Sequence, residues 1–135
     1  MEKIDWNPSF SVRVALLDEQ HKQIISMINL LFSDSEATVR SETTSELLTR
    51  MTKYAIDHFK TEEGLLEKYR YPELFAHKED HKTYRLKVLA LCQEAMDHKA
   101  SVPEELLQYL MEWWVNHILK TDMKYRSFFM ERTVT

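Results

Sequence analysis

The chain has 135 residues, a length that suits one domain with its own core, and its net charge is −4 at pH 7. Its 44 % apolar and 30 % charged residues are typical of a globular protein. The sequence lacks the basic stripe that would indicate binding of nucleic acid. One glycine and three prolines favour long helices over many strands. A single cysteine, Cys92, excludes an intrachain disulfide, and no apolar run could span a bilayer, so we expect a cytoplasmic protein.

The first half of the chain predicts an arm and two helices. Residues 1–17 form an irregular arm, and the first helix starts near Asp18, a candidate N-cap followed by an acidic first turn. The polar residues 33–45, SDSEATVRSETTS, form the first connection. A second helix follows, with apolar residues at helical spacing from Leu47 to Leu66.

The second half predicts two more long helices and a short one. The run YRYPE ends the second helix, and Pro72 suits the first turn of the third. The run DHKASVPEE forms the next connection, with Ser101 or Val102 as cap and Pro103 in the first turn of the fourth helix. A short terminal helix begins near Met123. These elements predict an all-α, up-down-up-down four-helix bundle as a single domain over residues 1–135.

The apolar stripe of each long helix is interrupted by residues of the types that commonly bind metals in proteins. Residues three, four or seven apart share a helix face. The stripes contain five histidines and one glutamate: His21, His58, Glu62, His77, His81 and His117. A second carboxylate, Asp122, follows the last of these histidines and shares its face only roughly. An ionised carboxylate is costly to bury unless it is paired or metal-bound. We therefore predict a metal site in the core.

The spacing of these residues suits a site with more than one ion. His58 with Glu62, and His77 with His81, are one helical turn apart, so both members of each pair can reach one centre. Asp122 lies five residues after a histidine, about 140° around an ideal helix, which predicts a local widening or a helix end. Seven donor residues are more than the four ligands that one tetrahedral zinc ion needs, and they fit two octahedral ions. A mixture of imidazole and carboxylate donors suits iron.

Taken together, the runs DEQHKQ, HFKTEE, HKEDH and HILKTD resemble the hemerythrin pattern H…HxxxE…HxxxH…HxxxxD. The arm DWNPSFSVRVALLDEQH is similar to that of the single-domain bacterial hemerythrins, and the resemblance covers the whole chain. It implies a non-heme diiron centre with an oxo or hydroxo bridge and O2 as its ligand. The implied ligands are His77, His81 and His117 on one iron, His21 and His58 on the other, and Glu62 and Asp122 as bridges.

The resemblance also implies a dry oxygen pocket beside the iron that has one protein ligand fewer. Its implied lining is Ile24, Phe59, Trp113, Trp114 and Ile118. The family commonly has leucine at the position of Trp114, three before the last histidine. A helical side chain leans over the preceding turn, so we expect this indole to narrow the pocket, with filling of a core gap as the alternative.

The function implied is reversible O2 binding for oxygen storage, transport or delivery, and not enzymatic catalysis. O2 or nitric oxide sensing through the same site is an alternative, with an oxygen-consuming enzyme or a signalling protein as partner. A diiron oxidase or iron-storage protein would need Glu-x-x-His motifs on two helices, which this sequence lacks. We expect a monomer that binds neither nucleic acid nor membrane.

Other polar residues have simpler interpretations. Tyr54, Tyr84 and Tyr125 are either hydrogen-bond donors behind the metal ligands or ordinary core aromatics. The runs KTEE and HKEDHK are expected to form surface charge pairs with no further role. His98 falls outside every stripe and is expected in solvent, and Cys92 is expected to be a small core residue.

Overall fold

The structure is a computed structural model that describes residues 3–34 and 36–135. Met1 and Glu2 of the predicted arm, and Ser35 of the predicted first connection, lie outside the described residues. The elements are η1 (Pro8–Phe10), α1 (Ala15–Ser33), α2 (Glu42–Lys68), α3 (Leu74–Met96), α4 (Val102–Glu112), η2 (Trp113–Asp122) and α5 (Lys124–Glu131). Here η1 is a 3-10 turn, and η2 is a π-helical segment that continues α4.

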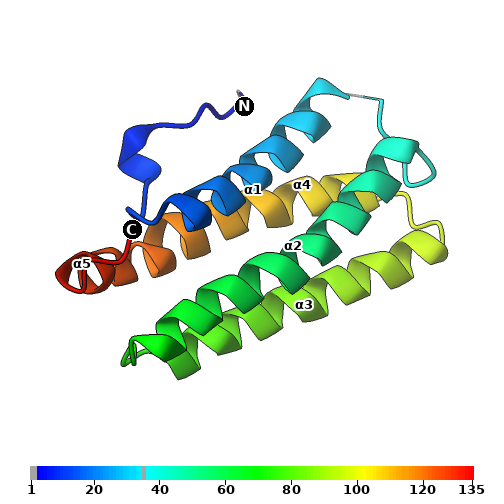
Figure 1. The fold of residues 1–135 in the computed structure, drawn as a ribbon. Coiled ribbons are helices and arrows are strands. Elements are labelled where there is room, and N and C mark those ends of the chain that lie inside the picture. The colour runs from blue at the N-terminus through cyan, green and yellow to red at the C-terminus, as the bar shows by residue number, and fades with distance from the viewer. Residues whose placement is uncertain (1–2, 35) are drawn as a thin grey trace.

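The long helices confirm the predicted bundle. Figure 1 shows α1, α2, α3 and α4 side by side, with successive helices running in opposite directions. The described residues form helices and no strand. The short terminal helix α5 is also present as predicted. No helix within residues 3–34 and 36–135 is long and apolar enough to cross a membrane.

The N-terminal arm is fixed to α1, and the first residue of α1 is bonded to the C-terminal residue. The Asn29 side chain exchanges two hydrogen bonds with the backbone of Ile4, at 2.9 and 2.8 Å. The backbone N–H of Ala15 donates to the carbonyl of Thr135 at 2.8 Å. The arm and the chain end therefore meet at one end of the bundle, as Figure 1 shows.

Two predicted helix starts are wrong by two or three residues. The helix α1 begins at Ala15, and the Asp18 carboxylate accepts hydrogen bonds from Ser11 Oγ at 2.6 Å and from the Val12 N–H at 2.8 Å. Asp18 thus anchors the arm instead of capping the helix. Pro72 lies in the turn before α3 and not in its first turn, because α3 begins at Leu74.

The start of the fourth helix agrees with the prediction. Val102 is the first residue of α4, Ser101 precedes it and Pro103 lies in the first turn. The Ser101 hydroxyl donates to the Glu105 carboxylate at 2.9 Å rather than bonding to the helix backbone. The two acidic residues of this turn complement the positive end of the helix dipole.

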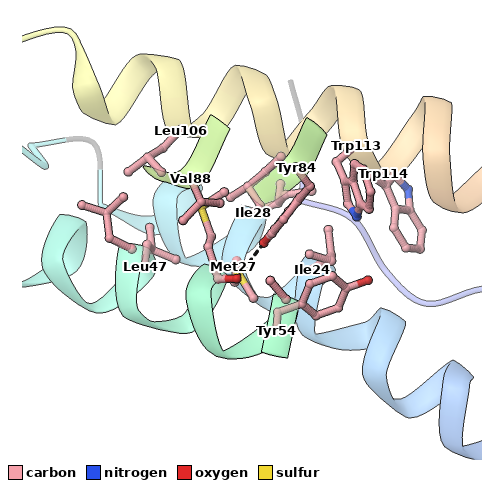
Figure 2. Close-up of a cluster of buried hydrophobic side chains, with 14 of the residues drawn as sticks. Ile24, Met27, Ile28, Leu47, Tyr54, Tyr84, Val88, Leu106, Trp113 and Trp114 are labelled. Atoms are coloured by element: carbon pink, nitrogen blue, oxygen red, sulfur yellow. Dashed lines mark hydrogen bonds between the residues drawn. The ribbon is translucent and has the colours of Figure 1, made fainter. Parts of the chain in front are cut away.

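Two apolar clusters fill the bundle and leave a polar layer between them. The larger cluster joins α1, α2, α3 and α4, as Figure 2 shows, and the smaller one joins the arm, α5 and the adjacent ends of α1 and α2. Along α1, His21 lies between Leu17 of the smaller cluster and Ile24 of the larger one. Along α2, Glu62 lies between Phe59 and Leu66 in the same way.

Candidate metal centre

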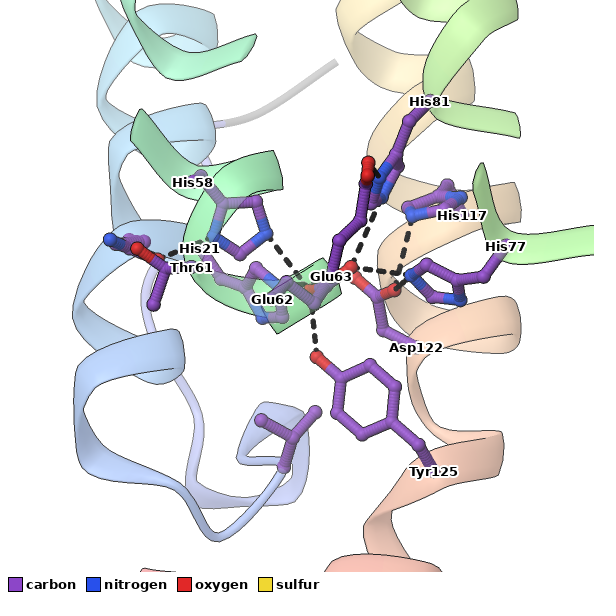
Figure 3. A network of polar contacts seen from close by, with 12 residues as sticks. His21, His58, Thr61, Glu62, Glu63, His77, His81, His117, Asp122 and Tyr125 are labelled. Carbon is purple, nitrogen blue, oxygen red and sulfur yellow. Dashed lines mark hydrogen bonds and ion pairs between the residues drawn. The ribbon is translucent and has the colours of Figure 1, made fainter. Parts of the chain in front are cut away.

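The seven predicted ligands lie together in this polar layer (Figure 3). Each is at most 3 % exposed, although all are polar or charged. They come from the four long helices of the bundle: His21 on α1, His58 and Glu62 on α2, His77 and His81 on α3, and His117 and Asp122 on η2. The helical spacing of the sequence therefore brings all seven side chains to one place.

The π-helical segment explains how Asp122 reaches the site. A π-helix joins residues five apart, so a side chain five residues after His117 returns to the same face. Both His117 and Asp122 are buried in η2, and their nearest side-chain atoms are 3.0 Å apart. The predicted local widening of the helix is confirmed.

The ligand atoms form two groups that share a carboxylate. In one group they belong to Glu62, His77, His81 and His117, and in the other to His21, His58, Glu62 and Asp122. Within each group, all the ligand atoms lie within 4.8 Å of one another. This division has three histidines on one side and two on the other.

Glu62 faces both groups with different oxygens. Its Oε1 lies 3.1 Å from His81 Nε2 and also contacts His77 Nε2. Its Oε2 lies 3.0 Å from His58 Nε2 and 3.4 Å from His21 Nε2. The carboxylate is therefore placed to bridge two ions.

Asp122 is arranged in the same way. Its Oδ1 lies 3.1 Å from His77 Nε2 and 3.0 Å from His117 Nε2. Its Oδ2 lies 3.1 Å from His21 Nε2. Two ligands held about 2.1 Å from one ion are about 3.0 Å apart at an octahedral angle and about 3.4 Å apart at a tetrahedral one. The three separations at Asp122 lie at the octahedral end of this range.

The hydrogen bonding of these atoms also fits a metal. Within the described part of the chain, no hydrogen-bond partner is found for Nε2 of His21, His58, His81 and His117, or for either oxygen of Asp122. These nitrogens and oxygens approach one another closely without hydrogen-bonding geometry. Buried polar atoms are rarely left unpaired, and cations at the centre of each group would satisfy them.

Three acceptors outside the predicted set orient three of the histidines. The acceptors are Gln20 Oε1 for His58 Nδ1 at 2.6 Å, Glu63 Oε2 for His81 Nδ1 at 2.6 Å, and Asp80 Oδ2 for His117 Nδ1 at 3.2 Å. A proton on Nδ1 leaves the Nε2 lone pair free for a metal.

The expectation that the runs KTEE and HKEDHK have no role beyond surface charge pairs is wrong. Glu63 and Asp80, which lie in these runs, each accept a hydrogen bond from a buried histidine. The sequence contains one signal for them. Gln20, Glu63 and Asp80 each stand next to a predicted ligand in the chain, yet each orients a histidine of another helix.

The three tyrosines near the ligands have different roles. The Tyr125 hydroxyl donates to Glu62 Oε2 at 2.8 Å, as Figure 3 shows. The Tyr84 hydroxyl donates to the backbone carbonyl of Met51 at 3.0 Å. The buried hydroxyl of Tyr54 has no partner among the described residues. Of the three tyrosines, Tyr125 is therefore the one that donates a hydrogen bond to a predicted ligand.

The carboxylates control the protonation of the metal-free site. Burial alone would lower the pKa of His21, but contact with Asp122 and Glu62 and their negative charges raise it to about 9. The pKa of His77 rises to about 10 for the same reasons. Burial would raise the pKa of Glu62, but the surrounding histidines hold it well below its usual value. Without metal, protons on His21 and His77 balance the carboxylate charge.

The residues of the predicted pocket are all buried, and all belong to the larger apolar cluster. The Phe59 ring stacks on His81 at 3.7 Å, and the Trp113 ring stacks on His117 at 3.9 Å. Ile24 and Ile118 are fully buried in the same cluster. Trp114 packs edge-to-face on Phe10 of the arm, with ring centroids 5.2 Å apart. Its effect on the pocket stays a prediction.

Two further residues can be placed. His98 is exposed in the connection between α3 and α4, as predicted. Cys92 is half-buried in α3 rather than in the interior of the core.

Fold and site together define a helical-bundle protein with a buried histidine and carboxylate cluster able to hold metal. Residues 12–128 match the family described as the hemerythrin HHE cation binding domain, and the chain belongs to the hemerythrin family. Hemerythrins are oxygen-binding proteins rather than enzymes, in agreement with the expectation from the sequence.

The similarity to known proteins extends along nearly the whole chain. The chain is 35 % identical over 126 residues to myohemerythrin of Theromyzon tessulatum, and the match covers 93 % of each protein. It is 31 % identical over 130 residues to bacteriohemerythrin of Methylococcus capsulatus, covering 93 % of this chain and 95 % of the other. A crystal structure of wild-type hemerythrin is 28 % identical in sequence to this chain, with a TM-score of 0.75. The match covers 93 % of this chain and 97 % of the hemerythrin chain.

Proposed function

We propose that this protein binds dioxygen reversibly at two non-heme iron ions held by the seven buried ligands. The observation that carries the proposal is the position of Glu62 and Asp122. Each presents one oxygen to the histidines of one group and the other oxygen to the second group. Two carboxylates in this arrangement suit two ions that share bridging ligands.

The unequal division of the histidines supports a free coordination position. In the proposal, His77, His81 and His117 hold one ion, and His21 and His58 hold the other. Because both carboxylates serve both ions, the second ion has one protein ligand fewer. When bound, the ion pair would supply an open position and two exchangeable electrons for a diatomic ligand.

The side chains around the site favour binding over turnover. Phe59 covers His81 and Trp113 covers His117 with a ring face, and both histidines are buried. In the metal-free protein, burial raises the pKa of the nearby Tyr54 hydroxyl well above its ordinary value. All seven ligands come from one chain, which supports a site that is complete in a monomer.

Iron loading and oxygen titration test this proposal. We expect the metal-free protein, given ferrous iron without air, to hold two irons per chain. Oxygen should then produce a visible absorption band that disappears under inert gas. A single bound ion, or irreversible oxidation on first exposure to oxygen, would overturn the proposal.

A pair of variants assigns the effect to the site. His58→Ala removes one of the two histidines of the second group and should abolish the reversible band. His98→Ala is the matched control, because this histidine is exposed and lies outside both groups. Loss of the band in both variants, or in neither, would contradict the ligand assignment.

A further inference from the structure

Tyr54 and Trp113 each place a buried hydrogen-bond donor beside the metal centre. Tyr54 is 1 % exposed and Trp113 is 6 % exposed. Neither the Tyr54 hydroxyl nor the Trp113 indole N–H has a hydrogen-bond partner in the described part of the chain. Buried polar groups are nearly always paired, so two unpaired donors near one site indicate a ligand that accepts hydrogen bonds.

The two side chains flank the centre on the side of the larger apolar cluster. The Tyr54 ring stacks on His58, with centroids 4.7 Å apart, and the Trp113 ring stacks on His117. Phe59 lies between them, 5.5 Å from the Tyr54 ring and 5.6 Å from the Trp113 ring. Figure 2 shows the Tyr54 hydroxyl and the Trp113 nitrogen directed into the same region, between α2 and the start of η2.

Both groups can offer a hydrogen bond to a ligand, because a phenol hydroxyl can donate its hydrogen and an indole N–H is a donor only. The indole N–H of Trp113 also approaches the Tyr54 oxygen, outside hydrogen-bonding geometry. This approach leaves the hydrogen of the Tyr54 hydroxyl free for a ligand.

We propose that Tyr54 and Trp113 form a hydrogen-bonding subsite that selects small ligands with negatively charged acceptor atoms at the proposed metal pair. The neighbouring Phe59 and Ile24 are apolar and cannot stabilise such charge. The two donors thus make an otherwise apolar lining bind anionic ligands in preference to neutral ones. This inference rests on the proposed function, because it requires the open position on the metal.

Azide is the probe that tests the subsite, because it is a small anion with acceptor atoms at both ends. Azide affinity is measured by visible absorption on the oxidised, iron-loaded protein. Tyr54→Phe and Trp113→Phe each remove one donor and should weaken azide binding about tenfold, since a hydrogen bond to a charged group is lost. The same variants should retain two irons per chain.

Tyr84→Phe is the matched control. Tyr84 is equally buried and packs 4.8 Å from the Trp113 ring, but its hydroxyl already donates to the Met51 carbonyl. Azide affinity should be unchanged in this variant. A change below about twofold in Tyr54→Phe, or an equal loss in Tyr84→Phe, would overturn the proposal.

Thermal unfolding of the metal-free protein provides a readout that needs no iron. Tyr54→Phe should leave the melting temperature unchanged or raise it, because no hydrogen bond is lost. Tyr84→Phe should lower it. An equal fall in both variants would show that the Tyr54 hydroxyl is satisfied within the protein, and would overturn the subsite. Two irons with reversible oxygen binding but no azide binding would overturn the subsite alone, whereas failure to bind iron would overturn both proposals.

Discussion

The hydrogen bond from Tyr125 to Glu62 gives the sharpest test of how the chain supports its ligands. Both side chains are fully buried, and the hydroxyl lies 2.8 Å from Oε2 of the carboxylate. A hydrogen bond to a charged acceptor contributes about 1.5–3 kcal/mol. Unfolding entropy of about 2.1 cal/mol/K per residue over 135 residues makes 1 kcal/mol equal to about 3.5 °C in melting temperature. Tyr125→Phe should therefore lower the melting temperature of the metal-free protein by about 5–10 °C.

Tyr84→Phe calibrates this magnitude. Its hydroxyl donates to the neutral carbonyl of Met51 at 3.0 Å, and such a bond contributes about 0.5–1.5 kcal/mol, or about 2–5 °C here. Both melting temperatures are measured by calorimetry at the same pH. Metal affinity, measured by competition with a chelator, should fall about 10- to 100-fold in Tyr125→Phe alone. Equal effects in the two variants would refute the reasoning.

Three further predictions concern access, pH and ligand orientation. Trp114→Leu should change the rates of oxygen binding and autoxidation in rapid mixing, and unchanged values of both would exclude a role for this indole in access. In the metal-free protein, the raised pKa values of His21 and His77, about 9 and about 10 against an ordinary 6.5, contribute stability that is complete below pH 6.5 and is lost as the pH rises toward 10. The melting temperature should fall over that range, and a flat profile would contradict the assigned charges. Glu63→Ala removes the acceptor of the His81 N–H and should weaken metal binding about tenfold or more in a chelator titration, whereas unchanged affinity would show that orientation contributes nothing.

The sequence by itself determined which seven side chains the candidate site would contain. Its helical stripes fixed the faces of the four long helices, and the metal-binding residues interrupted those faces. Even the widening at Asp122 followed from its distance of five residues from His117. These features depend on spacing within one helix, and spacing within a helix is a local property of the chain.

The tertiary structure decided how those helices support one another. Gln20, Glu63 and Asp80 serve histidines of other helices, and no rule of spacing within one helix indicates such a pair. The position of Trp114 against Phe10 depends on the path of the arm across the bundle. The observed start of α1 likewise differs from the predicted start, because Asp18 bonds to the arm and does not cap the helix.

The hydroxyls of Tyr54 and Tyr84 show most clearly what the sequence determines and what the tertiary structure decides. The sequence placed Tyr54 one turn before a ligand but left open whether its hydroxyl would find a partner. Tyr84 occupies a comparable position and bonds to Met51, whereas Tyr54 does not bond within the described chain. Helical spacing sets the direction in which a side chain leaves its own helix. The partner that it meets depends on how the neighbouring helices pack, which is a property of the assembled bundle.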